Sequence, residues 1–328
     1  MSALVLGAAA RGAAVDEAPV PLTDDTRRDF AVVIPAFNEA LVIPALISEL
    51  KAAFERHDLS GEVLLVDDGS TDGTADLAEK EADGWSALKV LRHPTNQGKT
   101  EAIITAARST GVTHLVLFDA DLQHLPDEIP RFLEKLQDGW DIVTGRKIGA
   151  YDKRAVSSLY NALSRRIFRV PVSDLNSMKA FRREVLEGLS LRHDWHRFFV
   201  VLAHARGCSV SEIDIELHPR RAGVSKYTGP FRIVVGVIDL MSVWFLLLFS
   251  RKPLMLFGSS GMALIALGIL VGVVAFYLRF VEGFGFRPFL YLVILLETVG
   301  FLMLGFGLLA EMIAQLREEV DSLRRGDR

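Results

Sequence analysis

Cysteine is nearly absent from this chain, whose 328 residues include only Cys208. One thiol excludes an intrachain disulfide framework and is typical of a reducing compartment. A large excess of either charge is also lacking, since the formal net charge is -4, so the composition does not indicate nucleic-acid binding. No basic residue precedes the short apolar stretch at 1–10, which argues against a signal peptide. The Ala-, Asp- and Pro-rich segment 1–28 instead predicts a disordered leader.

Long uncharged runs are missing up to residue 229 and dominate the rest of the chain. Pro253–Leu278 contains no charged residue, and Phe289–Ala310 contains only Glu297. A helix needs about 20 apolar residues to cross a bilayer, so these runs predict a two-helix transmembrane hairpin at 253–313. An ionised Glu297 is costly at that depth. We expect it to be protonated, to face the partner helix or to lie in an oligomer interface.

Basic residues gather at the two ends of this hairpin: Arg251, Lys252, Arg317, Arg324 and Arg325. The positive-inside rule then predicts a multi-pass protein of the cytoplasmic (inner) membrane, with the N-terminal domain and the tail 314–328 in the cytoplasm. The preceding segment, 230–252, is apolar but interrupted by charges. We expect an amphipathic helix in the membrane interface there, with a third span as the alternative.

Within 29–229, apolar runs of β type alternate with segments of helical spacing. The expected strands are Ala31–Pro35, Glu62–Val66, Ala87–Leu91 and His114–Phe118, and the expected helices are Ala40–His57, Ala75–Ala82 and Thr100–Ser109. The first helix is expected to bury a face that begins at Leu41. This alternation predicts a Rossmann-like α/β domain with a parallel sheet. Ligands of such sheets bind beyond the carboxyl ends of the strands, where three polar clusters of this sequence fall.

The sharpest of these clusters is Asp119-Ala120-Asp121-Leu122-Gln123. In an extended segment alternate side chains point the same way, so Asp119, Asp121 and Gln123 are expected to share a face. Two carboxylates and an amide oxygen suit Mg²⁺ or Mn²⁺, and no Cys/His cluster indicates zinc. Such a metal would neutralise a leaving diphosphate. The alternative is a solvated acidic loop after a strand.

Two further clusters suggest contacts with a nucleotide. Asp67 and Asp68 open a turn with Gly69 and Gly73, where carboxylates can accept from a base or a ribose hydroxyl. A plain turn with a helix cap is the alternative there. Asn96-Gln97-Gly98-Lys99 opens a helix, where backbone N–H groups and the Lys99 ammonium can meet phosphate.

Four motifs occur in order along the chain: Val33-Ile34-Pro35-Ala36-Phe37-Asn38-Glu39, Val66-Asp67-Asp68-Gly69-Ser70-Thr71-Asp72-Gly73-Thr74, Asn96-Gln97-Gly98-Lys99 and Asp119-Ala120-Asp121-Leu122-Gln123-His124-Leu125-Pro126. Together they resemble the family 2 glycosyltransferases, which have the GT-A fold. The resemblance is closest to dolichol-phosphate mannose synthases and bacterial polyprenyl-phosphate glycosyltransferases. It covers about residues 30–228, and the two-span tail is similar to that of bacterial and archaeal members.

The resemblance implies a role for each matching residue. The nucleotide-sugar would be bound by Pro35, Ala36, Asn38, Glu39, Asp67, Asp68, Gly98, Lys99, Asp119, Ala120 and Asp121. The metal would be held by Asp119, Asp121 and Gln123, and the acceptor phosphate by Arg146, Arg154 and Ser158. The catalytic residues would be Asp121, Arg221 and Lys226, of which the last two lie in Arg221-Ala222-Gly223-Val224-Ser225-Lys226-Tyr227, a match to the family's R-x-x-G-x-S-K-Y segment.

The implied reaction is metal-dependent, inverting transfer of a sugar from UDP-hexose or GDP-mannose to a polyprenyl phosphate such as undecaprenyl phosphate. A phosphate monoester is already an anionic nucleophile at neutral pH, and the Q-x-x-R-W motif common in members that glycosylate hydroxyls is missing. The expected partners are the bilayer, a second copy of the chain, and a flippase or downstream glycosyltransferase. A processive polysaccharide synthase and a non-catalytic scaffold are the alternatives. Asp174–Arg182 departs from the family pattern, so the resemblance does not specify the sugar.

Overall fold

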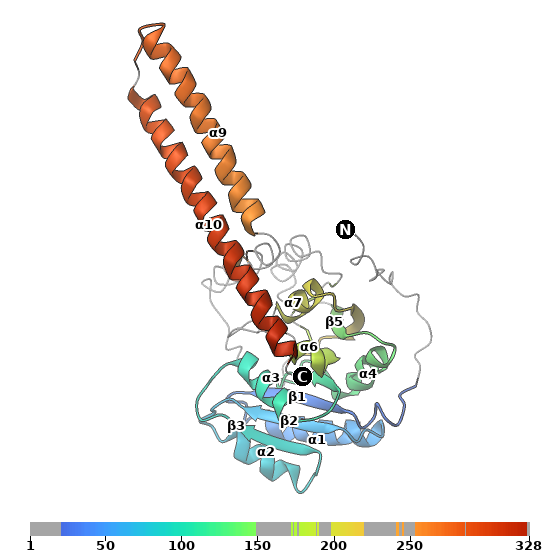
Figure 1. The fold of residues 1–328 in the computed structure, drawn as a ribbon. Coiled ribbons are helices and arrows are strands. Elements are labelled where there is room, and N and C mark those ends of the chain that lie inside the picture. Colours follow the sequence, from blue (N-terminus) through green and yellow to red (C-terminus); the bar gives the residue numbers. More distant parts are fainter. Residues whose placement is uncertain are drawn as a thin grey trace. The chain divides into compact units, whose positions relative to one another are not determined.

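The structure is a computed structural model, shown in Figure 1. It describes residues 21–148, 172, 174, 175, 177–187, 189, 198–219, 241, 242, 245, 253–285 and 287–326. The chain separates into two compact units, Met1–Arg232 and Ile233–Arg328. The boundary lies close to residue 229, where we expect the soluble domain to end.

The first unit is built on a seven-stranded sheet in the order β3-β2-β1-β4-β6-β5-β7. The strands are β1 (Phe30–Ala36), β2 (Glu62–Asp67), β3 (Leu88–Arg92), β4 (His114–Leu117), β5 (Ile142–Ile148), β6 (Lys179–Arg182) and β7 (Val210–Glu216). Strands β1 to β4 are mutually parallel, and β6 runs antiparallel to β4 and β5. The start of β6 therefore lies at the edge where the other strands end: Lys179 pairs with Leu117 on one side and Thr144 on the other.

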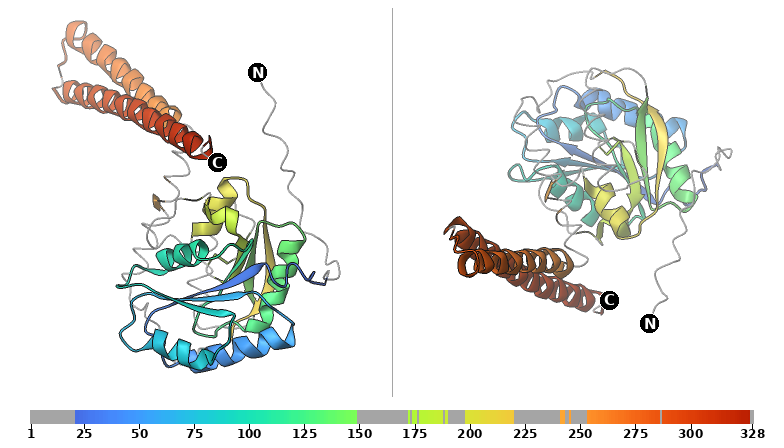
Figure 2. Two further views of the ribbon diagram at one scale, coloured as in Figure 1. Left: turned by 60° about the horizontal axis from the view of Figure 1, so that its bottom comes forward. Right: turned by 90° about the horizontal axis from the view of Figure 1, so that it is seen from above.

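Helices cover both faces of this sheet. They are α1 (Ile43–Arg56), α2 (Thr74–Ala82), α3 (Lys99–Arg108), the 3-10 turn η1 (Pro126–Glu128), α4 (Ile129–Gln137), α6 (Arg183–Glu187) and α7 (Phe199–Ala205). The left view of Figure 2 shows α1 and α2 on one side of the strands and α3 on the other. The α/β architecture predicted from the alternating pattern is confirmed. The expected parallel arrangement holds for β1 to β4, but not for β6, which runs antiparallel to both of its neighbours.

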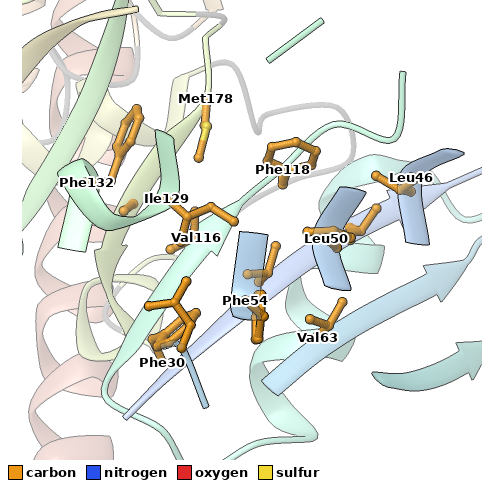
Figure 3. Close-up of a cluster of buried hydrophobic side chains, with 14 of the residues drawn as sticks. Phe30, Leu46, Leu50, Phe54, Val63, Val116, Phe118, Ile129, Phe132 and Met178 are labelled. Atoms are coloured by element: carbon orange, nitrogen blue, oxygen red, sulfur yellow. The ribbon is translucent and has the colours of Figure 1, made fainter. Parts of the chain in front are cut away.

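The main hydrophobic core lies between the sheet and helices α1 and α4 (Figure 3). Val32 and Ile34 of β1 point into this core, while Ala31 and Val33 are equally buried on the other face. A strand covered on both faces has a continuous apolar run rather than an alternating pattern, which is why the sequence alone predicts β1.

Two boundaries differ from the sequence-based expectation by more than one residue. Helix α1 begins at Ile43, not at Ala40, and Leu41 is 81% exposed instead of buried. The physical reason is that the backbone N–H groups of 38–40 donate to side chains of the 70–74 turn, so this stretch does not enter the helix. The first unit also includes the end of the expected leader: Leu22 is buried in the core, and the Arg27 guanidinium donates to the carbonyl of His57 at 2.7 Å.

In the part of the second unit that the structure describes, two long helices stand out, α9 (Pro253–Phe280) and α10 (Arg287–Gly326). Both are long and apolar enough to cross a membrane, with mean hydropathy of 2.5 and 2.3 in their most apolar windows. Only 11% of each window is buried within the protein, so the apolar side chains mostly face outward. Helix α10 also continues through most of the predicted tail, 314–328. Most of the expected interfacial segment, 230–252, lies outside the described residues.

Glycines let the two helices approach closely. A Cβ added at Gly261 would lie 2.6 Å from the carbonyl oxygen of Gly300. A Cβ at Gly268 would lie 2.7 Å from Oε1 of Glu297. Of the three settings expected for Glu297, the structure therefore shows the one that faces the partner helix. At the start of α9, the backbone N–H of Leu254 donates a hydrogen bond to the side chain of Glu311 at 3.2 Å. This bond satisfies one of the free N–H groups of the first helical turn.

Candidate active site

The carboxyl ends of β1 and β2 form the first part of the site. Pro35 and Ala36 pair with Val66 and Asp67 at these ends. Asn38 follows in the left-handed region, with φ 51°. Its backbone N–H donates to Ser70 Oγ, and its side-chain oxygen accepts from the Thr71 N–H, both at 2.8 Å. The Glu39 N–H donates to Thr74 Oγ1 at 2.9 Å. The first two motifs are thus joined into one polar wall.

Asp68 organises the loop that precedes α3. It is almost fully buried, and its carboxylate accepts hydrogen bonds from the backbone N–H of Gln97 at 2.8 Å and of Gly98 at 2.7 Å. His93 lies 2.8 Å away through Nδ1, and its Nε2 lies 2.9 Å from Thr105 Oγ1 of α3. The N–H groups of Gln97 and Gly98, which belong to the loop expected to meet phosphate, bond to the carboxylate of Asp68 in this structure. Because these hydrogen bonds join Asp68 to the loop before α3, Asp68 is a residue that positions this loop.

The segment 119–123 is a turn and not an extended strand. Strand β4 ends at Leu117, and Leu122 has a left-handed φ of 51°. The carboxylate of Asp121 accepts from the backbone N–H of Gln123 at 3.2 Å, as Asp side chains do in turns. The expectation that Asp119, Asp121 and Gln123 share a face because of strand alternation is wrong in its premise. The carbonyl of Gln123 is in turn held by the N–H of His218 at 2.9 Å.

Lys99 and Asp119 form an ion pair at this edge. The Lys99 ammonium, at the start of α3, donates to Oδ1 of Asp119. The two side chains are 26% and 41% exposed, so the pair lies at the mouth of the site and not in the core. Lys99, which is predicted to bind phosphate, and Asp119, which is predicted to bind metal, therefore contact each other.

A group of buried or half-buried titratable residues, which sequence reasoning did not place in the site, lies beside this pair: His124, Lys147, Asp174 and Lys179. Lys147 and Asp174 form an ion pair at 3.3 Å with little exposure. Burial, together with the positive charge of Lys99, lowers the pKa of Lys179 to about 8, and its ammonium donates to the carbonyl of Leu175 at 3.0 Å. Burial also lowers the pKa of His124 to about 4 against the opposing influence of Asp119, and its Nδ1 has no partner among the described residues.

The sequence carries one local signal for Lys179. It is a lysine between apolar neighbours in a short β-type run, Met178-Lys179-Ala180-Phe181. Met178 and Ala180 point into the main core, so Lys179 points to the opposite face. Only the antiparallel placement of β6 brings it to the end of β4, opposite Thr144 of β5.

Arg146, expected to bind the acceptor phosphate, is paired with Asp214 of the neighbouring strand. Nε and Nη2 donate to the two carboxylate oxygens at 2.5 and 2.8 Å, a bidentate arrangement. This pairing raises the pKa of Arg146 and lowers that of Asp214. The other expected phosphate contacts and catalytic cations lie outside the described residues: Arg154, Ser158, Arg221 and Lys226.

The described residues fit a divalent metal that is shared with a bound diphosphate. Asp119 and Asp121 supply hard oxygen ligands, but no group of three His, Cys, Asp or Glu able to hold a metal occurs in the part of the chain that the structure describes. Mg²⁺ is commonly bound by one or two carboxylates, with substrate phosphates and water completing its shell. The carboxylate pair suits such a shared site better than an all-protein one.

Comparison with known families decides the class. The model of the family "Glycosyl transferase family 2" matches residues 31–204, and hence all the motifs at the sheet edge up to 123. The chain belongs to glycosyl transferase family 2. It is therefore a glycosyltransferase with a GT-A-like fold, as the four motifs predicted.

Several curated relatives of this glycosyltransferase act on lipid phosphates by name. The chain is 31% identical to a dodecaprenyl-phosphate galacturonate synthase of Rhizobium johnstonii, over 88% of each chain. It is 30% identical to an undecaprenyl-phosphate 4-deoxy-4-formamido-L-arabinose transferase of Serratia proteamaculans, over 88% of this chain and 90% of that one.

Among solved structures, the fold is similar to glucosyl-3-phosphoglycerate synthase of Mycobacterium tuberculosis in complex with Mn²⁺, UDP and phosphoglyceric acid. The TM-score is 0.54 at 19% identity, covering 67% of this chain and 78% of that one. A second structure of the same enzyme, with Mg²⁺ and UDP, has a TM-score of 0.53. At such identity the likeness shows the fold only.

Proposed function

We propose that this glycosyltransferase moves a sugar from a nucleoside-diphosphate sugar, UDP-hexose or GDP-mannose, to a polyprenyl phosphate such as undecaprenyl phosphate. The observation that carries the proposal is similarity to named polyprenyl-phosphate sugar transferases over 88% of this chain. The residues of this chain that lie outside the match are fewer than the residues of α9 and α10 together. The match must therefore include part of these apolar helices. Both the catalytic unit and the membrane hairpin therefore support the same acceptor class.

The chemistry of the acceptor fits the residues at the sheet edge. A phosphate monoester has a second pKa near 6, so its oxygen is already anionic at neutral pH and needs no protein base. We infer a single displacement. The phosphate oxygen bonds to the anomeric carbon, the bond from that carbon to the β-phosphate oxygen breaks, and the nucleoside diphosphate leaves with the electron pair. Attack opposite the leaving group inverts the anomeric configuration.

Charge at the leaving diphosphate is the main electrostatic demand of this step. A divalent cation held by Asp119, Asp121 and Gln123 would supply Lewis-acid stabilisation there when bound. Arg221 and Lys226 are proposed to contact the same diphosphate, and Asp121 is proposed as the buried ligand that fixes the site. We propose that the nucleoside binds at the carboxyl ends of β1 and β2, against Pro35, Ala36, Asn38, Glu39 and Asp67.

The acceptor side is proposed to lie along β5. Arg146 would contact the lipid phosphate with the N–H groups that Asp214 leaves available, and Arg154 and Ser158 would complete the contact. Insertion of α9 and α10 in the cytoplasmic membrane, with the catalytic unit in the cytoplasm, would keep the site near the depth of the lipid head group. A second copy of the chain, a flippase or a downstream glycosyltransferase are proposed as partners.

A donor panel tests the proposal. Purified full-length protein is incubated with undecaprenyl phosphate, Mg²⁺ or Mn²⁺, and each of a set of UDP- and GDP-sugars. We expect one donor to give a glycolipid whose sugar is released by mild acid, as a sugar bound through a single phosphate should be. Transfer to a growing glycan in place of lipid phosphate would instead support a processive synthase. No transfer from any donor would contradict the proposal.

A further inference from the structure

The ion pair of Lys99 and Asp119 places a protein cation on a carboxylate proposed to bind metal. The position of Lys99 is well fixed. Asp68 holds the two preceding backbone N–H groups, and Gly98 turns the chain into α3 with φ 90° and ψ 159°, a conformation that glycine adopts without strain. The backbone from which the Lys99 side chain reaches Asp119 is therefore fixed by the fold.

A second ammonium reinforces this positive charge. Lys179 is 3% exposed and lies where β6 meets the end of β4, in the electrostatic range of both Lys99 and Asp119. Its one described hydrogen bond goes to a neutral carbonyl, that of Leu175. The positive charge of Lys179 thus acts on Asp119, and Asp174 and Lys147 also lie within its electrostatic range, with opposite effects.

The protein's own ligands are too few to overcome these cations. A divalent ion that approaches Asp119 meets the Lys99 ammonium on Oδ1 and also the positive charge of Lys179. Like charges a few ångströms apart repel strongly in a partly buried site. No third acidic, His or Cys ligand compensates in the described part of the chain. A nucleoside diphosphate brings the missing negative charge and also offers oxygens to which Lys99 can move.

We propose that Lys99, backed by Lys179, acts as the resident counter-ion of Asp119 and makes divalent-metal binding depend on the diphosphate of the nucleotide. This inference rests on the proposed function and specifies how its site is loaded. Metal and nucleotide enter as a unit, and the Lys99 ammonium passes from Asp119 to a phosphate oxygen. Because coupling between two ligands is reciprocal, the nucleotide raises metal affinity by the same factor as the metal raises nucleotide affinity.

The test measures Mn²⁺ binding directly, by electron paramagnetic resonance of free Mn²⁺ titrated with full-length protein in detergent. Titrations are run without nucleotide, with UDP and with GDP. For the wild type we expect weak binding without nucleotide and at least about tenfold tighter binding with one of the two. Lys99→Met should strengthen nucleotide-free binding by about tenfold and reduce the gain that the nucleotide gives. Lys179→Met should likewise strengthen nucleotide-free Mn²⁺ binding and reduce the gain that the nucleotide gives.

Two matched variants control for shape and for general charge. Lys99→Arg keeps the cation beside Asp119 and should bind Mn²⁺ like the wild type. Lys89→Met removes a lysine that also pairs with a carboxylate, Glu62 at 3.3 Å, but at the start of strands β2 and β3. It should leave Mn²⁺ affinity within about twofold. Thermal unfolding confirms that each variant is folded.

Unchanged nucleotide-free Mn²⁺ affinity in folded Lys99→Met would overturn the inference, as would wild-type binding that is equally tight with and without either nucleotide. Its failure is distinguishable from failure of the proposed function. If glycolipid is formed but Lys99→Met leaves metal affinity unchanged, the function stands and the inference does not. If the coupling is found but no sugar reaches polyprenyl phosphate, the inference stands and the acceptor assignment fails.

Discussion

Arg146 of β5 and Asp214 of β7 face each other across parallel strands and form a bidentate ion pair, with N–O distances of 2.5 and 2.8 Å. A guanidinium has five N–H donors, so this pair leaves donors for a phosphate while limiting the directions in which they point. Asp214 is in this respect a positioning residue for the proposed acceptor contact.

Removal of Arg146 should therefore weaken acceptor binding. We expect Arg146→Ala to raise the KM for polyprenyl phosphate by about tenfold while the KM for the donor stays near its wild-type value, since a charge-assisted hydrogen bond contributes roughly 1.5–3 kcal/mol. Asp214→Asn should raise the acceptor KM less. Steady-state kinetics with each substrate varied in turn measures this split. An unchanged acceptor KM in Arg146→Ala would remove Arg146 from the acceptor site.

Asp68 should matter more for stability than its exposed counterparts. Asp68→Asn keeps one oxygen that can accept one backbone N–H group but places an NH2 donor against the other, at a cost of roughly 1–3 kcal/mol. We expect lower thermal stability and weaker nucleotide binding in this variant. Asp83→Asn, at an exposed left-handed position that Asn tolerates well, is the control and should change little. Equal melting temperatures for the two variants would contradict the positioning role.

Lys179 should reduce the stability of the protein that carries it. Its pKa falls from the ordinary 10.5 to about 8 on folding, so keeping it protonated at pH 7 costs on the order of 3 kcal/mol. The folded state loses this proton at lower pH than the unfolded chain. The free energy of unfolding therefore increases as the pH rises from about 8 to 10.5. Lys179→Met should raise the melting temperature at pH 7 by a few degrees.

The pH dependence identifies the cause of that gain. The advantage of Lys179→Met over the wild type should be fully present below pH 8 and shrink as the pH approaches 10.5. Thermal unfolding of both proteins is measured across this range. The effects of other titrating groups are the same in both proteins and cancel in the difference between them. A variant less stable than the wild type at every pH would show that the Lys179 ammonium is net stabilising in the fold.

The helix hairpin offers a test of the second unit. Gly261→Leu forces a side chain against the carbonyl of Gly300 and should separate α9 from α10. We expect less monodisperse protein on size exclusion after detergent extraction. Gly305→Leu, on α10 where an added Cβ would meet nothing within 4 Å, should behave like the wild type. Equal behaviour of the two variants would contradict the close packing of α9 against α10.

Much of this architecture follows from local sequence. The runs around Val33 and Val66 are apolar because both faces of the sheet are covered, and the polar residues that follow them mark the strand ends. This pattern is enough to locate the proposed metal ligands along the chain. It does not predict their geometry, because Leu122 turns the backbone into the left-handed region where strand alternation no longer applies.

What sequence reasoning misses depends on contacts between distant residues. Nothing local in the sequence shows that the Asp68 carboxylate accepts from the backbone N–H groups of Gln97 and Gly98. Lys179 escapes prediction because its place at the edge requires β6 to enter the sheet antiparallel between β4 and β5. Leu41 satisfies the helical spacing, yet the hydrogen bonds of residues 38–40 to the next turn keep it out of the helix.

The initial rate of glycolipid formation in Asp121→Ala tests the central claim most directly. With the best donor of the panel, undecaprenyl phosphate and either Mg²⁺ or Mn²⁺, we predict a rate lower than that of the wild type by at least about 100-fold. Asp76→Ala, which removes an exposed carboxylate of α2 that pairs with Arg92, should keep its rate within about twofold. Near-normal transfer by folded Asp121→Ala would contradict a catalytic role for the carboxylates at this edge of the sheet.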